Sequence, residues 1–279
     1  FGESKSDYDI FSCLADKLGF LNSFTENKSE LDWLKYLWDE SKKVSEKMNL
    51  KLPEFDKFWE DGFFEVPIER TKKIMFKDFR DNPKINALNT PSGKIEITSN
   101  IIKNYNLKDC KGHPTWIEPY EWLGRKENFP LHLISNQPEY RLHGQLDNAE
   151  YSLKNKIKDR EPVLINIEDA KERNIENNDV VLIFNKRGRV LAGARLSDEI
   201  MRGVLVLSTG AWFDPDYEIN TDLHGNPNVL TKDIGTSQLS QAPTSHTCLV
   251  EIRKAKKNEI KKVQIFLKPK IQKKLEQKY

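Results

Sequence analysis

Apolar residues recur at helical spacing through the first part of the chain. Residues 6–19 place four apolar side chains on one face and end at Gly19, a residue typical of helix C-termini. Residues 29–48 repeat this pattern after Ser29, which is a favourable N-cap. Residues 53–68 mix aromatic and charged side chains and predict a short helix followed by a loop. The first part of the chain is therefore predicted to be mostly helical.

The pattern then changes to short apolar or alternating runs that are typical of strands. A turn followed by a short alternating strand is predicted at residues 90–98, and a single helical turn at residues 197–199. Residues 168–174 predict a short helix with acidic side chains in its first turn. Strands are also predicted at 131–134, 163–167, 180–184, 189–196, 204–207 and 247–252.

Short strands separated by brief helices suggest a closed barrel, because closure protects the edges of a small sheet. The order of strand, capped helix, turn, hairpin and single turn is consistent with a double-psi barrel. The predicted fold class is α+β, with a mostly helical portion at 1–128, a double-psi β-barrel at 129–252 and a Lys-rich tail at 253–279.

Polar side chains dominate residues 135–148, directly after the strand predicted at 131–134. A strand that runs into such a loop is how many α/β folds present a binding edge. Arg141 and His143 suit a diphosphate, and the amide side chains suit a fused heterocycle with donors and acceptors on its edge. A polar surface loop without a ligand is the less favoured interpretation, because so many donors are rarely packed between two apolar segments.

Two more polar loops follow predicted strands. In residues 209–215, Trp212 either covers a ligand face or anchors the barrel rim, and the residues favour neither alternative. Residues 224–241 surround one small apolar pair with polar groups, and His246 precedes the last strand. The plausible ligand groups in this second loop are Asn226, Asn228, Thr231, Lys232, Asp233, Thr236, Ser237 and Gln241.

Composition narrows the function classes. The 279 residues correspond to one large or two ordinary domains. With 45 basic and 43 acidic residues, the net charge of +2 argues against a nucleic-acid footprint along the whole chain. No apolar run approaches the roughly 20 residues that a membrane span needs, and no signal peptide is present. The chain begins with Phe1 rather than Met and is expected to be a fragment or a processed product.

Metal and nucleophile motifs are absent from the sequence. Cys13, Cys110 and Cys248 lie far apart, so small buried thiols are favoured over a zinc site or disulfides. Isolated histidines (His143, His224 and His246) are more often hydrogen-bonded side chains than metal ligands, and GxSxG, Walker and GxGxxG motifs are all missing. The ten lysines of the tail predict a surface helix or a solvated end rather than a nucleic-acid or membrane site.

Several motifs in a fixed order carry a family resemblance. Residues 131–148 resemble the start of the C-terminal domain of the dimethyl sulfoxide reductase family of molybdenum enzymes, closest to the biotin sulfoxide and trimethylamine N-oxide reductases. The resemblance covers roughly residues 1–253, and the Lys-rich tail departs from it. Further motifs that match the family lie at 5–11, 90–97, 109–114, 160–170, 187–194, 210–215, 228–237 and 246–251.

The resemblance implies a bis(molybdopterin guanine dinucleotide) cofactor, two-electron reduction of an S- or N-oxide, and a barrel that closes over both pterins. It implies pterin and diphosphate contacts from Ser135, Asn136, Gln137, Tyr140, Arg141, His143, Gln145 and Asn148. It further implies that Asn228, Gln241 and His246 hold the second pterin. Trp212 and Asp214 would then lie near the substrate funnel.

Members of this family are far longer than 279 residues, and their molybdenum-ligating serine lies outside the matching region. The resemblance therefore implies no catalytic residue and no metal ligand in this chain, which should be inert alone. The expected partners are the remainder of its polypeptide, an S- or N-oxide and an unidentified electron donor. The expected compartment is the periplasm, with the cytoplasm as the alternative. A free-standing barrel that acts as a binding or assembly module is the rival hypothesis.

Overall fold

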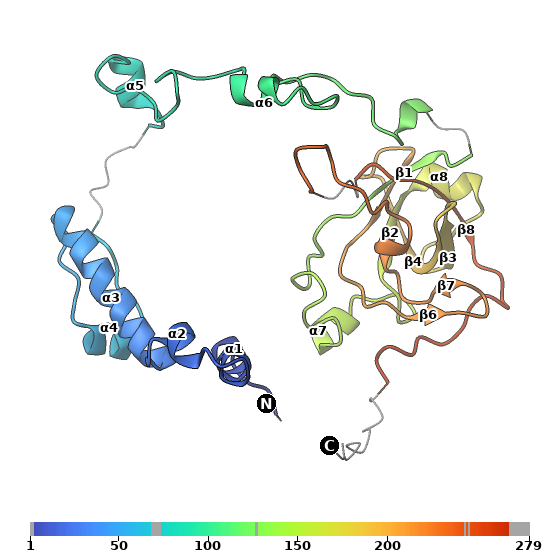
Figure 1. Cartoon of the computed structure of the whole chain (residues 1–279). Coiled ribbons are helices and arrows are strands. Elements are labelled where there is room, and N and C mark those ends of the chain that lie inside the picture. The colour runs from blue at the N-terminus through green and yellow to red at the C-terminus, as the bar shows by residue number, and fades with distance from the viewer. Residues whose placement is uncertain (1–2, 68–73, 126–127, 243, 245, 268–279) are drawn as a thin grey trace. The chain divides into compact units, whose positions relative to one another are not determined.

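The computed structural model describes residues 3–67, 74–125, 128–242, 244 and 246–267 (Figure 1). The chain divides into two compact units, Phe1–Ala87 and Leu88–Tyr279, and each is described by itself. The domain boundary predicted near residue 128 rests on a change in sequence pattern, whereas this division into units rests on compactness. The predicted boundary stays a prediction. None of the helices in these described ranges is long and apolar enough to cross a membrane.

The first unit consists of short helices and one long helix. Its helices are α1 (Asp7–Lys17), α2 (Leu21–Thr25), α3 (Glu30–Lys47), α4 (Phe55–Asp61) and α5 (Lys77–Asp81). The predicted cap of α3 is present, because Ser29 and Asp32 each accept a backbone N–H from the other. Most apolar side chains stay open to solvent within the unit, including Leu14 and Leu37. Local capping and helical spacing, rather than a large core, therefore define these helices.

Residues 88–125 are mostly irregular, with α6 (Asn100–Asn104) and the 3-10 helix η1 (Leu123–Arg125). The turn predicted at 90–98 forms, since the Gly93 N–H donates to the Thr90 carbonyl at 2.9 Å. The strand predicted after it is wrong: these residues are in turns and bends, and Ile95 and Ile97 are exposed. Alternating apolar residues fit a strand only where a neighbouring strand supplies backbone partners, and none pairs with residues 94–98 in the described structure.

The second unit contains a closed barrel (Figure 1). Its strands are β1 (Leu131–Ile134), β2 (Pro162–Asn166), β3 (Val180–Phe184), β4 (Arg189–Ser197), β5 (Val204–Leu207), β6 (Pro215–Asp216), β7 (Thr221–Asp222) and β8 (Leu249–Lys254). The sheet runs β2-β5-β1-β8-β3-β4-β7-β6, and the parallel pairing of β2 with β4 closes a ring. The short helices are α7 (Glu150–Leu153), α8 (Ile167–Glu172) and the 3-10 helix η2 (Pro227–Val229).

Inward-facing residues of every strand in the ring form one core. Leu133, Val163, Ile165, Ile183 and Leu205 have no exposed surface, as expected for alternate positions of a closed barrel. The predicted α+β class, with a helical portion and a small closed barrel, is confirmed.

Three local predictions need correction. The helical turn predicted at 197–199 is wrong: Ser197 ends β4, and its hydroxyl accepts the Glu199 N–H at 3.1 Å, a local bond that competes with helix. Cys248 is buried as predicted, but Cys13 is exposed on α1. Residues 255–267 are neither a helix nor a solvated end, because Val263 is buried and the Gln264 N–H donates to Asp214 at 2.7 Å. Residues 268–279 of the predicted tail lie outside the described residues.

Candidate functional site

Two loops leave the barrel side by side. β1 and β5 are parallel neighbours, with Ile134 opposite Val206, so the loops after them begin at the same rim. The Thr209 N–H donates to the Asn136 carbonyl at 2.9 Å, and the Ser208 hydroxyl donates to the Asn136 side chain at 2.9 Å. The topology therefore brings together two polar loops that are about 70 residues apart in the sequence.

A third segment reaches this rim because β8 runs antiparallel to β1. The residues that enter β8 lie beside the end of β1, and the Leu133 N–H donates to the Cys248 carbonyl at 2.9 Å. The polar residues that precede β8, including His246, thus approach the same end of the barrel as Ser135.

A cavity of about 570 Å³ lies where these segments meet. This volume is typical of a small-molecule site. Five residues predicted to bind cofactor line it: Ser135, Gln137, His143, Asn228 and His246. The remaining lining residues are Thr209, Thr231, Lys232 and Asp233, and all nine come from the polar loops.

The cavity offers both donors and acceptors. The Ser135 hydroxyl is buried and has no hydrogen-bond partner within the described structure. The Gln137 amide nitrogen lies 3.0 Å from His143 Nδ1, and Lys232 supplies a cation that is paired with Glu121 at 3.0 Å. An unpartnered buried hydroxyl, amides, imidazoles and an ammonium suit a ligand that combines a heterocycle edge with phosphates.

The other predicted site residues lie outside this cavity. Asn136 and Tyr140 line a smaller hollow of about 140 Å³, which shares Gln137 with the main cavity. Gln145, Asn148 and Gln241 are exposed, and Asp214 is buried. Their predicted roles at the cofactor and the funnel stay predictions.

A buried ion network lies beneath the loop that follows β1. The Lys156 ammonium is 2.6 Å from Asp147 and 2.5 Å from Glu161, and all three side chains are almost completely buried. Arg141 is 3.2 Å from Glu161 and also donates to the Thr209 carbonyl at 3.1 Å. With a side chain only 1% exposed, Arg141 has the geometry of a compensated cation that joins two loops, not of a free cation.

Two titratable groups at this network, Asp147 and His224, have lowered pKa values. Burial alone would raise the pKa of Asp147, but Lys156 and the Trp212 N–H outweigh burial and lower it. Burial and the nearby Lys156 lower the pKa of His224, whose Nδ1 lies 2.9 Å from the Trp212 carbonyl. Because a carbonyl only accepts, Nδ1 carries the proton of the neutral ring. His224 thereby fixes the backbone at Trp212.

Trp212 itself ties two loops together. Its indole N–H donates to the Gly144 carbonyl at 2.6 Å, and its backbone N–H donates to Asp147 at 3.0 Å. Of the two alternatives that the sequence leaves open, this geometry favours an anchor of the rim. Gly210 lies next to this contact with φ +89°, and a Cβ there would come within 2.1 Å of the His143 carbonyl oxygen. Only glycine permits this approach of two backbones.

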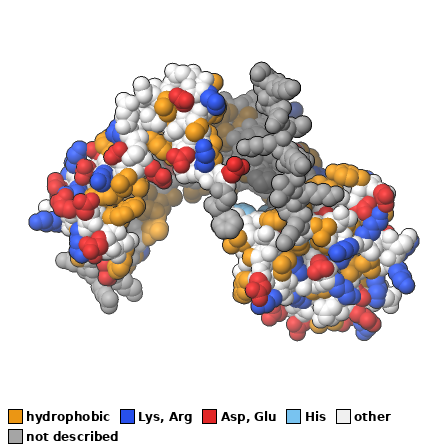
Figure 2. All heavy atoms as spheres, turned by 90° about the horizontal axis from the view of Figure 1, so that it is seen from below, with side chains coloured by type: hydrophobic (Ala, Val, Ile, Leu, Met, Phe, Trp, Pro, Cys, Tyr) orange, Lys and Arg blue, Asp and Glu red, His pale blue; other side chains and the backbone are white. Residues whose placement is uncertain are grey.

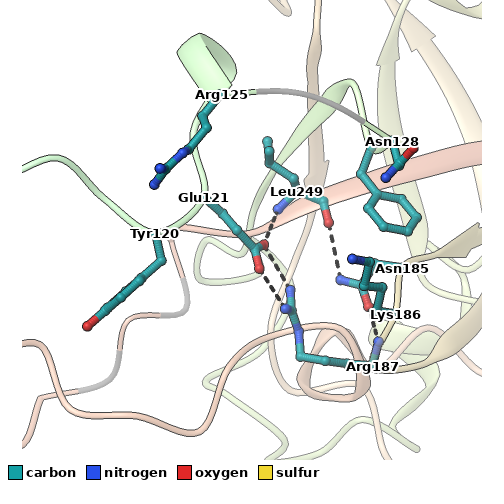
Figure 3. A pocket seen from close by; sticks show the side chains of 9 residues that line it. Tyr120, Glu121, Arg125, Asn128, Asn185, Lys186, Arg187 and Leu249 are labelled. Atoms are coloured by element: carbon teal, nitrogen blue, oxygen red, sulfur yellow. Dashed lines mark hydrogen bonds and ion pairs between the residues drawn. The ribbon is translucent and has the colours of Figure 1, made fainter.

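A second hollow of about 270 Å³ has the Glu121–Arg187 pair in its wall (Figure 3). Glu121 also accepts the Leu249 N–H and pairs with Lys232, so it links this wall to the main cavity. The sequence interpretation missed Glu121, Lys156 and Glu161, because charged residues are usually solvated. The one local signal is that Glu161 directly precedes a buried strand.

A closed mixed barrel with polar loops around one rim cavity defines a ligand-binding domain, and comparison with known proteins identifies its class. Residues 131–249 match the family described as "Molydopterin dinucleotide binding domain". The matched region is therefore a molybdopterin dinucleotide-binding domain, and the predicted cofactor class is confirmed.

Curated relatives extend this match over most of the chain. The chain is 43% identical over 260 residues to a trimethylamine-N-oxide reductase of Haemophilus influenzae, covering 90% of this chain and 32% of the relative. It is 42% identical to a biotin sulfoxide reductase and 40% identical to a dimethyl sulfoxide/trimethylamine N-oxide reductase, both of Cereibacter sphaeroides, with 34% and 31% of those relatives covered. The chain spans about a third of the length of these relatives.

A solved structure supports the fold. Acetylene hydratase from Pelobacter acetylenicus aligns with a TM-score of 0.67 over 91% of this chain and 33% of that protein, at 16% identity. Together the comparisons confirm the resemblance to the dimethyl sulfoxide reductase family: the barrel matches a molybdopterin dinucleotide-binding domain, and most of the chain is similar to proteins named as S- and N-oxide reductases.

Proposed function

We propose that this chain is the part of a molybdenum S- or N-oxide reductase that holds the pterin and diphosphate of molybdopterin guanine dinucleotide. The observation that carries the proposal is the convergence of Ser135, Gln137, His143, Asn228 and His246 on one cavity, since they come from two connections far apart in sequence, the loop after β1 and the connection from β7 to β8. When bound, the cofactor would supply the two-electron oxygen-atom chemistry, and the protein would supply binding and orientation.

The residues divide by their chemistry. Ser135, Gln137 and Asn228 offer the neutral donors and acceptors that the amino-oxo edge of a pterin requires. His143, His246 and Lys232 offer the donors that suit a diphosphate, and Lys232 is also paired with Glu121. Arg141, in the loop after β1, has a different role. It donates to Glu161 and to the Thr209 carbonyl in the loop after β5, and so joins the two loops.

Activity requires more than this chain. The relatives are about three times as long, and we propose that the metal ligand and most of the nucleotide-binding scaffold lie in the remainder of the polypeptide. The chain alone would then be inactive toward S- and N-oxides. The rival hypothesis, a free-standing barrel, is disfavoured because the relatives match 90% of the chain and not the barrel alone.

Binding of molybdopterin guanine dinucleotide to the purified chain tests the proposal, with the fluorescence of the pterin as the readout. The variants His143→Ala and Asn228→Ala should each weaken binding about five- to tenfold, because each removes about 1 kcal/mol of polar contact. Asp198→Ala, an exposed barrel substitution away from the cavity, is the control and should leave the affinity unchanged. Equal affinity of all four proteins would contradict the site assignment.

A further inference from the structure

The loop of residues 232–246, of which the structure describes residues 232–242, 244 and 246, has both of its ends at the cavity. Lys232 and Asp233 line the cavity at one end, and His246 lines it at the other. Between these ends the loop folds on itself: the Thr236 N–H donates to the Ala242 carbonyl at 2.8 Å, and the Ser237 N–H donates to the Ser240 carbonyl at 3.2 Å. Its tip is therefore a compact turn that projects from the rim.

The tip of this loop is clamped by a segment about 130 residues earlier in the chain. The Gln238 N–H donates to Asp109 Oδ2 at 3.0 Å, and the Lys108 N–H donates to Gln238 Oε1 at 3.0 Å. The two bonds are reciprocal: on each side of the contact, a side-chain oxygen accepts a backbone N–H from the other side. Leu239 of the loop tip and Asp109 both line one hollow of about 440 Å³.

The segment that carries Asp109 has a defined internal structure. Leu107 and Cys110 form an antiparallel bridge, and the Ser99 N–H donates to the Gly112 carbonyl at 2.6 Å. Gly112 has φ +81°, and a Cβ there would lie 2.7 Å from the Ser99 carbonyl oxygen. A segment with a defined internal structure can position the loop that it contacts.

We propose that Asp109 and Gln238 are positioning residues that set the rim of the cofactor cavity through the 232–246 loop. The proposal rests on the function proposed above. Residues 96–112 then form a brace for the cavity, rather than a passive connector between the helical unit and the barrel. Loss of the clamp would leave Lys232 and His246 in less defined positions and would weaken their contacts with the diphosphate.

Hydrogen exchange of the full chain without cofactor tests the clamp directly. Asp109→Ala should speed exchange about tenfold both at residues 236–240 and at the cavity ends, residues 231–233 and 246–248, because opening of the tip frees the whole loop. Asp109→Asn should restore near-normal exchange, since its amide oxygen still accepts the Gln238 N–H. Asp198→Ala is again the control. Faster exchange at the tip alone, with the cavity ends unchanged, would overturn the proposal.

Cofactor affinity supplies a second readout. Asp109→Ala and Gln238→Ala should each weaken molybdopterin guanine dinucleotide binding several-fold. Because both substitutions break the same clamp, the double variant should have about the affinity of the single variant that binds less tightly. Fully additive losses would overturn the coupling. If the wild-type chain fails to bind the cofactor, the proposed function fails for the isolated chain, and the exchange experiment still decides whether the clamp sets the rim.

Discussion

Glu121 and Arg187 form a two-pronged ion pair, with Nη1 to Oε1 at 2.6 Å and Nη2 to Oε2 at 2.9 Å (Figure 3). Such parallel bonds fix geometry as well as adding energy. Glu121 also accepts the Leu249 N–H at the start of β8 and pairs with Lys232 at the cavity. One carboxylate thus connects the segment before the barrel, a hairpin, a strand and the proposed cofactor site.

The stability of the chain should depend on the charge of Glu121. Burial opposes ionisation, but Arg187, the Leu249 N–H and Lys232 outweigh burial and lower the pKa of Glu121 from 4.5 to about 2. A depressed folded-state pKa adds stability that is present above the unfolded-state value and lost as pH falls. About 2 kcal/mol of unfolding free energy should be lost between pH 4.5 and pH 2, after allowance for partial solvent screening.

Urea unfolding of wild type and Glu121→Gln across this pH interval measures the effect. The wild type should lose its advantage over the variant as pH falls, because protonation removes the charge that the variant lacks. A constant difference in unfolding free energy from pH 6 to pH 3 would contradict the assigned role of the carboxylate.

Lys156→Met should destabilise the chain by about 3 kcal/mol or more, because it leaves the buried carboxylates of Asp147 and Glu161 short of a cation. Lys154→Met is the matched control: its partner Glu150 is one helical turn away, and both side chains are exposed. The control should change the unfolding free energy by less than about 0.5 kcal/mol. Similar effects of the two substitutions in urea unfolding would argue against the buried network.

Gly210→Ala should open the rim. A Cβ at Gly210 would lie 2.1 Å from the His143 carbonyl oxygen, so the two loops would have to separate. Gly203 provides the control, because it has a similar φ of +79° but its Cβ position would make only an ordinary contact, with the Leu123 side chain at 3.8 Å. Gly203→Ala should cost about 1 kcal/mol from backbone strain alone, and Gly210→Ala more than about 2 kcal/mol, with loss of cofactor binding.

The readouts are thermal unfolding and pterin fluorescence. If Gly210→Ala cost no more than Gly203→Ala and kept the wild-type affinity, the close contact of the two loops would be unimportant for the site.

Cys13 and Cys248 should differ sharply in their reactivity toward thiol reagents. Burial raises the pKa of Cys248 to about 11, whereas Cys13 is exposed on α1. The thiolate is the reactive form, so Cys13 should react with a maleimide in the folded chain and Cys248 only after unfolding. Mass spectrometry of the labelled peptides gives the result. Rapid labelling of Cys248 under native conditions would show that the end of the barrel at β8 opens readily.

Strands with strong local patterns could be predicted from the sequence. Residues 180–184 and 204–207 are continuous apolar runs between turn residues, and both form strands with the predicted bounds. Residues 94–98 alternate between apolar and polar side chains, which also predicts a strand. They form none, because strand pairing depends on distant chain segments. The failure therefore lies in partner choice and not in the local pattern.

The candidate site, too, could be predicted from the sequence only in part. The density of polar residues in the loops around Ser135 and Asn228 indicated binding groups, and these loops share the cavity. Their convergence follows from the β1–β5 and β1–β8 pairings, which no local motif encodes. For the same reason, the sequence suggested Arg141 as a cation for a diphosphate, and it could not show that Asp147 and Glu161 pair with Arg141 in the fold.

Hydrogen exchange of the chain with and without molybdopterin guanine dinucleotide tests the central claim most directly. The claim predicts slower exchange on binding in four segments together: residues 135–143, 209–210, 228–233 and 246–248. Protection confined to the hollow beside Glu121, or to the hollow around Leu239, would place the cofactor elsewhere. No protection in any of the four segments, under conditions in which the cofactor binds, would contradict the account.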